Sequence, residues 1–579
     1  MASTLRNRYL LPFQPNTQDK KSLLKSPFRI IGQKVGASGV LLAGIFVMGH
    51  SAVAHSAVAN METGRSQAGY KWFENTSLYS SPNSMDSPTF SLPELGSGGG
   101  RFIEVNKHKA LGEWSLQRLG KSAPLINDPW SQEQLESMAW QINAQARNQA
   151  PLALMVINNA SINAFAIPGG VMGIHTGTVI ESNSIDEVAS VIAHEVAHLS
   201  QRHYEHRDEA SRKALLMQIG GILAAIAASA ADGDAAAAVM MGSQTAALNA
   251  QMAFSRSNER EADRIGMQLM AKAGYDPRAM PKFFGVLDQK TQLNMSDNAY
   301  LPSFIMTHPL SSERLSEAQS RANSYPTLGL NSQRHQLNFE LLKWRLKVLS
   351  NQTTENELLI TASTNKGAEM ALAYWYAKHN RYSEAQSRLN KLKKTSSISS
   401  ASDKASFDIL LAITEAQVAG LQGNWQQAEK VLTPYYNLYP ERRDLKLLMA
   451  DAWLQLGKHN KVITSMKPIV QSRPHDLEGL YRMQRAYELM AIEGQANNSG
   501  AGTQPLVKEI AAVNALRYRA KGELWRGKYS EALVSLQQAK KQVEDLSKSS
   551  NTVAFNPKPL LANLNSEVAE VKTARDFRP

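Results

Sequence analysis

The strongest hydrophobic pattern in the chain lies in residues 185–201. Apolar side chains recur there at the spacing of one helix face, at Ile185, Val188, Ala189 and Ile192. Ser184 and Glu187 form the S-x-x-E pattern of a capping box, and no proline or glycine interrupts the segment. We therefore expect a helix that begins just after Ser184.

A second pattern repeats in the C-terminal third. A glycine or asparagine is followed two positions later by an aromatic residue and three positions after that by alanine. In one weaker copy, histidine replaces the aromatic residue and valine replaces the alanine. The copies begin at Asn380, Gly423, Gly457 and Gly527. The second and third copies are 34 residues apart, as are Pro440 and Pro474. This separation equals the tetratricopeptide period and predicts all-α tetratricopeptide repeats in residues 325–579; a generic antiparallel helical bundle is the alternative.

Residues 101–324 combine helices and strands. The expected order is helix, strand, strand, the helix of 185–201, a long helical insert and a charged helix at 254–267. That order indicates an α+β domain dominated by helices. The predicted architecture is therefore a helix-dominated α+β domain followed by an all-α repeat domain.

The insert at 215–243 has two interpretations. It is rich in alanine and glycine among larger apolar side chains, and small residues allow close helix packing in membranes and in soluble bundles alike. Its first apolar run is marginal in length for a membrane span, which needs about 20 residues. The segment is either a helical hairpin lid beside a cleft, in peripheral contact with a lipid surface, or an ordinary buried core helix.

The first 100 residues are predicted to lie outside the folded domains. Basic residues from Arg6 to Lys34, a short apolar core at 40–48 and small-residue cleavage sites are typical of an export signal peptide over residues 1–54. This signal predicts a periplasmic protein, and an uncleaved inner-membrane anchor is the alternative. Residues 55–100 are rich in serine, asparagine, proline and glycine and are expected to form a flexible linker.

Composition excludes several classes of function. The net charge is +12, but seven lysines and arginines, against one aspartate, lie in residues 1–54, so about half of that charge belongs to the predicted signal. The remaining charge is spread along helices without a nucleic-acid-binding motif, so no nucleic-acid partner is expected. The absence of cysteine excludes disulfides, a thiol nucleophile, a thiolate metal site and a lipid-attachment cysteine.

The helix of 185–201 carries an HExxH motif formed by His194, Glu195 and His198. Positions i and i+4 lie one turn apart on the same face, so both imidazoles can reach one metal ion. Imidazole suits Zn²⁺, and a catalytic zinc takes three protein ligands and leaves a position for water. Glu195 is placed to take a proton from that water. The motif predicts zinc-dependent peptide-bond hydrolysis, with one zinc per subunit; two histidines on a surface helix by chance are the alternative.

The charged helix at 254–267 offers a third ligand. Glu259 and Asp263 are i and i+4 and therefore share a face. Glu259 can bind zinc through a carboxylate oxygen, and Asp263 can accept the outer N–H of a ligand histidine and fix its tautomer. Arginines lie among these acids, so a solvated charged face is the alternative.

Taken together, these motifs resemble the metallopeptidase family that includes the HtpX proteases and the CAAX prenyl proteases. The HExxH motif and the ExxxD pattern of Glu259 and Asp263 are the core of the resemblance. Other matching segments are Asn163-Ala164-Phe165-Ala166, Thr176-Gly177, Gln201-Arg202-His203, and Thr307-His308-Pro309 with Arg314 after it. The resemblance covers residues 92–321 and is closest to a periplasmic subgroup with tetratricopeptide repeats. One departure is Ile167-Pro168, where relatives often carry an aromatic residue.

The resemblance implies a role for each matching residue. Three residues would bind zinc: His194, His198 and Glu259. Glu195 would be the general base, and Asp263 would orient a ligand histidine. His308 would be either a regulatory fourth ligand, which occupies the water position in the resting enzyme, or part of a structural His-Pro turn.

The segment Asn163, Ala164, Phe165 and Ala166 also has two interpretations. As a strand edge it could bind an extended substrate by strand addition, and as a buried core strand it would have no chemical role. Pro168, shortly after it, removes one backbone donor from any such pairing.

Two classes of function agree with this pattern. The first is a periplasmic zinc endopeptidase that degrades misfolded or stalled outer-membrane proteins and can assist their assembly as a chaperone. The second is a repeat-based chaperone or scaffold whose metal site is silenced or structural. The resemblance implies outer-membrane biogenesis as the setting, unfolded or misfolded outer-membrane proteins as substrates, and the β-barrel assembly machinery as the partner.

Overall fold

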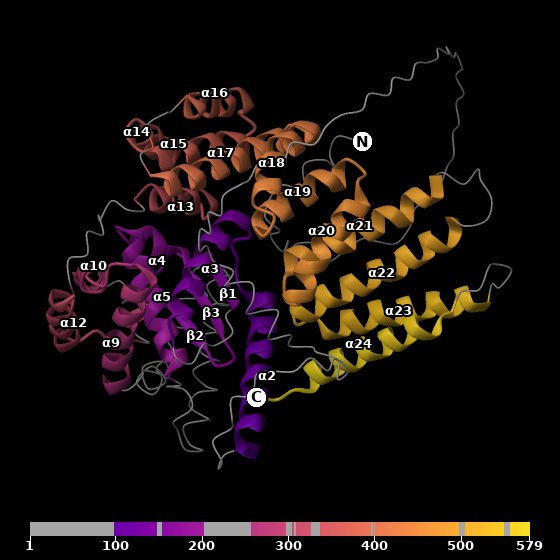
Figure 1. The fold of residues 1–579 in the computed structure, drawn as a ribbon, viewed down its shortest axis with the longest axis horizontal. Helices are drawn as coiled ribbons and strands as arrows, with labels where there is room; N and C mark the ends of the chain where they lie inside the picture. Colours follow the sequence, from indigo (N-terminus) through magenta and orange to yellow (C-terminus); the bar gives the residue numbers. More distant parts are fainter. Residues whose placement is uncertain are drawn as a thin grey trace, which may run out of the picture.

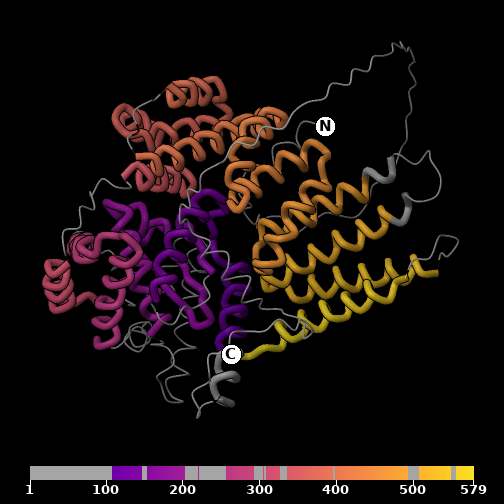
Figure 2. The backbone as a smooth tube through the Cα atoms, viewed as in Figure 1, coloured from indigo at the N-terminus to yellow at the C-terminus, as the bar shows by residue number. Residues whose placement is uncertain are grey.

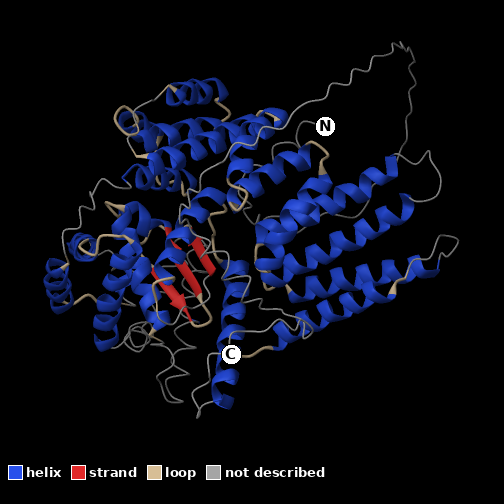
Figure 3. Ribbon diagram, viewed as in Figure 1, coloured by secondary structure: helices blue, strands red, loops and turns tan. Residues whose placement is uncertain are grey.

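A computed structural model gives the fold of the chain (Figure 1). It describes residues 98–146, 153–201, 220, 256–296, 304–305, 308–325, 336–394, 398, 400–496, 504–548 and 556–579. The predicted signal peptide, the predicted linker up to residue 97 and nearly all of the insert at 215–243 lie outside the described residues. Helices dominate what is described, and one small sheet lies among the helices of the N-terminal half (Figure 3).

The sheet has three strands in the order β1-β3-β2. Strand β1 (Ala153–Ile157) runs parallel to β3 (Val171–His175), and β2 (Ala164–Ile167) runs antiparallel to β3. Gly169 and Gly170 connect β2 to β3 with φ angles of 91° and 81°, which glycine adopts without the strain that other residues meet. The sequence predicted two strands before the HExxH helix, and the structure has three because this glycine turn folds the chain back on itself.

Seven helices of the N-terminal half are described. They are α2 (Gly98–Ser122), α3 (Pro129–Asn143), α4 (Thr176–Glu181), α5 (Ile185–Ser200), α9 (Arg256–Ala273), α10 (Ala279–Ser296) and α12 (Ser312–Ser324). Helix α5 is the centre of this region, because it packs against α3, α9, α10 and strand β2. The predicted α+β architecture dominated by helices is confirmed for this half of the chain.

Helix α5 begins where the sequence predicts. The Ser184 hydroxyl accepts a hydrogen bond from the Glu187 N–H at 3.2 Å and so caps the first turn. The Glu187 carboxylate accepts from the Asn183 N–H at 2.8 Å, one residue before the donor that a capping box would use. Ser184 and Glu187 therefore both stabilise the start of the helix, although the Glu187 carboxylate bonds the N–H of Asn183 instead of that of Ser184.

The described residues after 335 form helices alone, which confirms the all-α prediction for them. These helices are α13 (Gln336–Leu349), α14 (Glu355–Thr361), α15 (Lys366–Lys378), α16 (Tyr382–Lys393), α17 (Ala401–Leu421), α18 (Trp425–Leu438), α19 (Arg443–Gln455), α20 (His459–Ser472), α21 (Leu477–Ala496), α22 (Gln504–Trp525), α23 (Tyr529–Lys548) and α24 (Lys558–Asp576). Every copy of the sequence repeat lies at a turn between two helices and begins with a positive φ, at Asn380, Gly423, Gly457 and Gly527. The assignment of these helices as tetratricopeptide repeats stays a prediction.

The helices after 335 curve around the N-terminal half (Figure 2). Helix α13 packs on α3, α4 and α5, helix α19 packs on α3, and α22 packs on α2. One continuous hydrophobic core extends through both halves, from α2 to Trp525 at the end of α22. The two halves therefore share a core.

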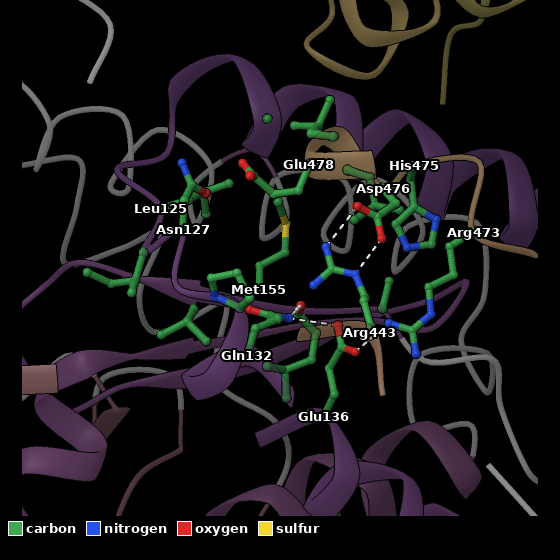
Figure 4. A pocket seen from close by; sticks show the side chains of 18 of the residues that line it. Leu125, Asn127, Gln132, Glu136, Met155, Arg443, Arg473, His475, Asp476 and Glu478 are labelled. Atoms are coloured by element: carbon green, nitrogen blue, oxygen red, sulfur yellow. Dashed lines mark hydrogen bonds and ion pairs between the residues drawn. The ribbon is translucent and has the colours of Figure 1, made fainter. Parts of the chain in front are cut away.

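Helix α3 carries two acids that pair with arginines of the C-terminal helices. Arg345 of α13 donates to Asp128, the N-cap of α3, at 2.6 and 2.8 Å, and both side chains are buried. Arg473 contacts Glu136 at 2.6 Å. This second pair lies beside a small cavity between the two halves, about 120 Å³ in volume, which Trp525 also lines (Figure 4). One buried and one partly exposed ion pair thus connect the α3 region to the C-terminal helices at two points.

The described helices differ from membrane-spanning segments in length or in hydropathy. Not one of them is at once long enough and apolar enough to span a bilayer.

Candidate metal centre and active site

Helix α5 places three polar side chains of the HExxH motif in the core. His194, Glu195 and His198 are each at most 3% exposed. The Nε2 atoms of the two histidines lie 3.1 Å apart, because one helical turn separates their positions. Two imidazole nitrogens this close in a buried space can serve one metal ion.

Helix α9 brings Glu259 to the same point. Its carboxylate oxygens lie 3.5 Å from His194 Nε2 and 3.5 Å from His198 Nε2, and the side chain is buried. The solvated charged face that was the alternative for this helix is therefore wrong for Glu259. The predicted third ligand lies beside the two histidines.

The close approach of α9 to α5 depends on Gly266. A Cβ atom at this position would lie 3.3 Å from the carbonyl carbon and oxygen of Ala193, the residue before His194. A glycine inside a helix costs about 1 kcal/mol relative to alanine, so its presence in α9 indicates a packing requirement. Sequence reasoning did not single out Gly266, although a lone glycine in a helical pattern was the available signal.

His308 completes the cluster. Its Nδ1 lies 3.0 Å from Glu259 Oε1 and 3.3 Å from His194 Nε2, and its Nε2 lies 3.4 Å from Glu195 Oε1. Phe304 stacks on the ring at 4.8 Å between centroids. The histidine therefore stands between Glu195 and the other candidate ligands.

Four candidate ligand atoms, from His194, His198, Glu259 and His308, lie within 4.8 Å of one another and all four residues are buried. Three imidazole nitrogens and one carboxylate oxygen are a donor set that suits a transition-metal ion such as zinc. The chemistry of the residues present therefore fits a metal site.

Asp263 lies one turn after Glu259 and contacts the outer nitrogen of a candidate ligand. Its Oδ1 is 3.0 Å from His194 Nδ1. Burial raises the pKa of Asp263, but the charge and hydrogen bonds of Arg314 outweigh burial, so its pKa lies below the usual value. An ionised Asp263 can hold the His194 ring with its Nε2 toward the cluster, as the sequence predicted.

The two glutamates of the site differ in their pKa. Burial raises the pKa of Glu195, and the nearby His308 and His194 oppose this only in part. Burial also acts on Glu259, but the charge of His308 and hydrogen bonds from the three histidines hold its pKa well below the usual range. A raised pKa suits a group that must accept and return a proton near neutral pH, whereas a lowered pKa favours the ionised carboxylate that a cation ligand needs.

The predicted substrate segment is an edge strand that is also buried. Ala164, Phe165 and Ala166 belong to β2, which packs against α5 and, among the described residues, pairs with β3 alone. The backbone N–H of Ala166 lowers the pKa of Glu195, against the larger effect of burial. Asn163 precedes the strand, and its backbone N–H and C=O are bonded to the Thr178 hydroxyl. The segment therefore lies beside the cluster, and its role in substrate binding stays a prediction.

Comparison with known proteins agrees with this geometry. Residues 126–322 match peptidase family M48. The chain is 28% identical to the beta-barrel assembly-enhancing protease of Escherichia coli (strain K12) over 466 residues, which is 78% of this chain and 88% of that protein.

Two further relatives match shorter parts of the chain. The beta-barrel assembly-enhancing protease of Yersinia pestis is 33% identical over 40% of this chain and 47% of its own length. The mitochondrial metalloendopeptidase OMA1 of Arabidopsis thaliana is 28% identical over 40% of this chain and 44% of its own length. The chain therefore carries a metalloendopeptidase domain of peptidase family M48 and is similar, over most of its length, to the beta-barrel assembly-enhancing proteases.

Proposed function

We propose that this protein is a zinc-dependent endopeptidase of the bacterial periplasm that cleaves misfolded or stalled outer-membrane proteins. The observation that carries the zinc site is the convergence of His194, His198 and Glu259, with Glu195 next to them. The substrate class rests on the similarity to beta-barrel assembly-enhancing proteases. The periplasmic location rests on the signal-like pattern in residues 1–54.

Each residue of the site has its own role in peptide-bond hydrolysis. His194, His198 and Glu259 would hold zinc, which when bound polarises the scissile carbonyl and acidifies water. Glu195 accepts the proton of the attacking water and returns it to the leaving amine. Asp263 keeps the His194 ring in the orientation that presents Nε2 to the cluster.

We also propose that His308 closes the site in the resting enzyme. The ring lies between Glu195 and the candidate ligands, within 3.4 Å of atoms on both sides. A water molecule activated by Glu195 would need the same space. The enzyme would then cleave only when the segment that carries His308 moves away.

Partner binding is proposed for the C-terminal helices. A surface groove of about 510 Å³ lies between α18, α19 and α20, and Tyr436 and Trp453 line it. A second groove of about 520 Å³ lies between α21, α22 and α23. The first groove offers two aromatic rings among polar side chains, and the second combines apolar and charged side chains, so each can hold a segment of a protein partner. The beta-barrel assembly machinery is the proposed partner.

The substitution Glu195→Gln tests the enzyme assignment. Glutamine keeps the shape of the side chain but cannot act as a base, so cleavage of an unfolded outer-membrane protein should fall by roughly 10²-fold or more while bound zinc is retained. Glu261→Gln is the control, because Glu261 lies on α9 two residues from Glu259 but is 42% exposed and pairs with Arg264. Normal cleavage by the Glu195 variant would contradict the assignment and leave a repeat-based chaperone or scaffold as the function.

A further inference from the structure

Arg314 is a buried cation that the proposed mechanism does not yet use. It lies in the first turn of α12, where its N–H donates to the cap residue Ser311, and its side chain is 3% exposed. The Phe284 ring covers it, with the guanidinium carbon 5.2 Å from the ring centroid. A buried guanidinium must find acceptors for its N–H groups, so its partners indicate what it holds in place.

One set of partners orients the His194 ring. Arg314 Nε and Nη2 donate to the two oxygens of Asp263, each at 2.8 Å, in a bidentate pair. The oxygen that accepts from Nη2 also lies 3.0 Å from His194 Nδ1. Arg314 therefore fixes the carboxylate on which the orientation of His194 depends.

The remaining nitrogen joins two other parts of the cluster. Arg314 Nη1 lies 2.8 Å from Glu259 Oε2, as a close charge contact. The same nitrogen donates to the carbonyl of Pro309 at 2.9 Å and lies 3.4 Å from the carbonyl of His308. One nitrogen thus holds both the turn that positions His308 and the carboxylate of Glu259.

We propose that Arg314 is a positioning residue that joins the His308–Pro309 turn to Glu259 and to the Asp263–His194 pair, so that the closing histidine and the ligand carboxylate move together. The inference rests on the proposed function, in which His308 is a regulatory ligand. Withdrawal of the turn removes the Pro309 carbonyl from Nη1, while Asp263 still holds the guanidinium. The contact of Nη1 with Glu259 Oε2 then changes as well, because the same nitrogen makes it. Opening of the site is in this way coupled to the geometry of the third ligand.

The test uses the full-length protein and two measurements besides activity. Zinc affinity is measured by competition with a chromophoric chelator, and the visible absorption spectrum of the Co²⁺-substituted protein reports the ligand geometry. Arg314→Met should weaken zinc binding by about 10- to 100-fold, as loss of partners of metal ligands does, and should change the Co²⁺ spectrum. Arg321→Met on the same helix, where Arg321 is 42% exposed, should change neither.

A double-mutant cycle with His308→Ala separates coupling from general stabilisation. If Arg314 acts through the turn, Arg314→Met should weaken zinc binding clearly less in the His308→Ala background than in the wild type. Equal effects in the two backgrounds, or zinc affinity within twofold of the wild type together with an unchanged Co²⁺ spectrum, would overturn the proposal.

Arg314→Lys is the second variant, and it replaces Arg314→Met in both measurements if the methionine variant does not fold. Lysine retains the buried charge but cannot make a bidentate pair and reach the turn at the same time, so its zinc affinity should fall at least threefold and its Co²⁺ spectrum should differ from the wild type. A lysine variant that matches the wild type in both measurements would refute the inference. Wild-type protein that binds neither zinc nor cobalt would instead refute the proposed function.

Discussion

Loss of the Arg345 side chain should destabilise the whole protein through the interface between its two halves. Arg345 and Asp128 are each 3% exposed and form two hydrogen bonds, at 2.6 and 2.8 Å. Asp128 also caps α3 by accepting from the N–H and hydroxyl of Ser131. The substitution Arg345→Met keeps the length and the apolar stem of the side chain and removes its charge.

The expected cost follows from the burial of both partners. Removing one member of a buried ion pair leaves an uncompensated charge and costs about 3–5 kcal/mol. Arg345 also stacks over the Tyr374 ring at 4.7 Å, which adds to the loss. The double substitution Asp128→Asn with Arg345→Met removes both charges while asparagine still caps α3, so it should recover at least about 2 kcal/mol of the loss.

The Asp128–Arg345 pair also makes the stability of the protein depend on pH. Burial raises the pKa of Asp128, but the charge and hydrogen bonds of Arg345 outweigh it and leave the pKa below its usual value. The pair therefore contributes stability that is present above about pH 4 and is lost as the pH falls through the lowered pKa. In Arg345→Met the pKa of Asp128 should rise, so Asp128 becomes protonated between pH 7 and pH 5. The difference in free energy of unfolding between the variant and the wild type should therefore be smaller at pH 5 than at pH 7.

Urea unfolding followed by circular dichroism measures these differences. Arg381→Met is the control, because Arg381 is 39% exposed and pairs with Glu355 at the surface, where an ion pair contributes little to stability. A loss below about 1 kcal/mol for Arg345→Met, or a double variant no more stable than the single one, would refute the reasoning.

Three further predictions concern the site and the sheet. His308→Ala should raise cleavage of an unfolded protein if His308 closes the site, and a folded variant with less activity than the wild type would contradict that role. Glu259→Ala should lose bound zinc on metal analysis while Glu261→Gln keeps it; equal metal content in both would exclude Glu259 as a ligand. Burial lowers the pKa of His175 to about 4, so its neutral form stabilises the fold above about pH 6.5 and this stability is lost as the pH falls toward 4. Between pH 7 and pH 5 the free energy of unfolding, measured with urea, should therefore fall by about 2 kcal/mol less in His175→Gln than in the wild type. Equal decreases in the two proteins would contradict this prediction.

Local patterns predicted the parts of the site that one helix contains. The spacing of His194 and His198 follows from helical geometry, and the cap at Ser184 is set by residues next to it in the chain. Glu259 and Asp263 could be placed on one face of a helix for the same reason. Their contact with the histidines needed the resemblance to a known family, because 69 positions separate His194 from Asp263.

Other features could not be read from the sequence because they depend on contacts between distant segments. Arg345 and Asp128 are 217 positions apart, and Tyr529 donates to Gln117 across 412 positions. The position of His308 depends on its stacking with Phe304 and on the carbonyl contacts of Arg314. No periodicity or motif reports such pairings, since each helix alone has several faces that could be buried.

The absence of a side chain at Gly266 has a consequence for how the candidate ligands come together. Its missing side chain allows α9 to contact the Ala193 carbonyl, and Glu259 lies two turns earlier on the same helix. A methyl group at this position would press on the Ala193 carbonyl and on the Met280 side chain, so these neighbours would have to give by a few tenths of an ångström. The helix with the two histidines and the helix with the carboxylate can therefore approach each other closely because one residue between them has no side chain.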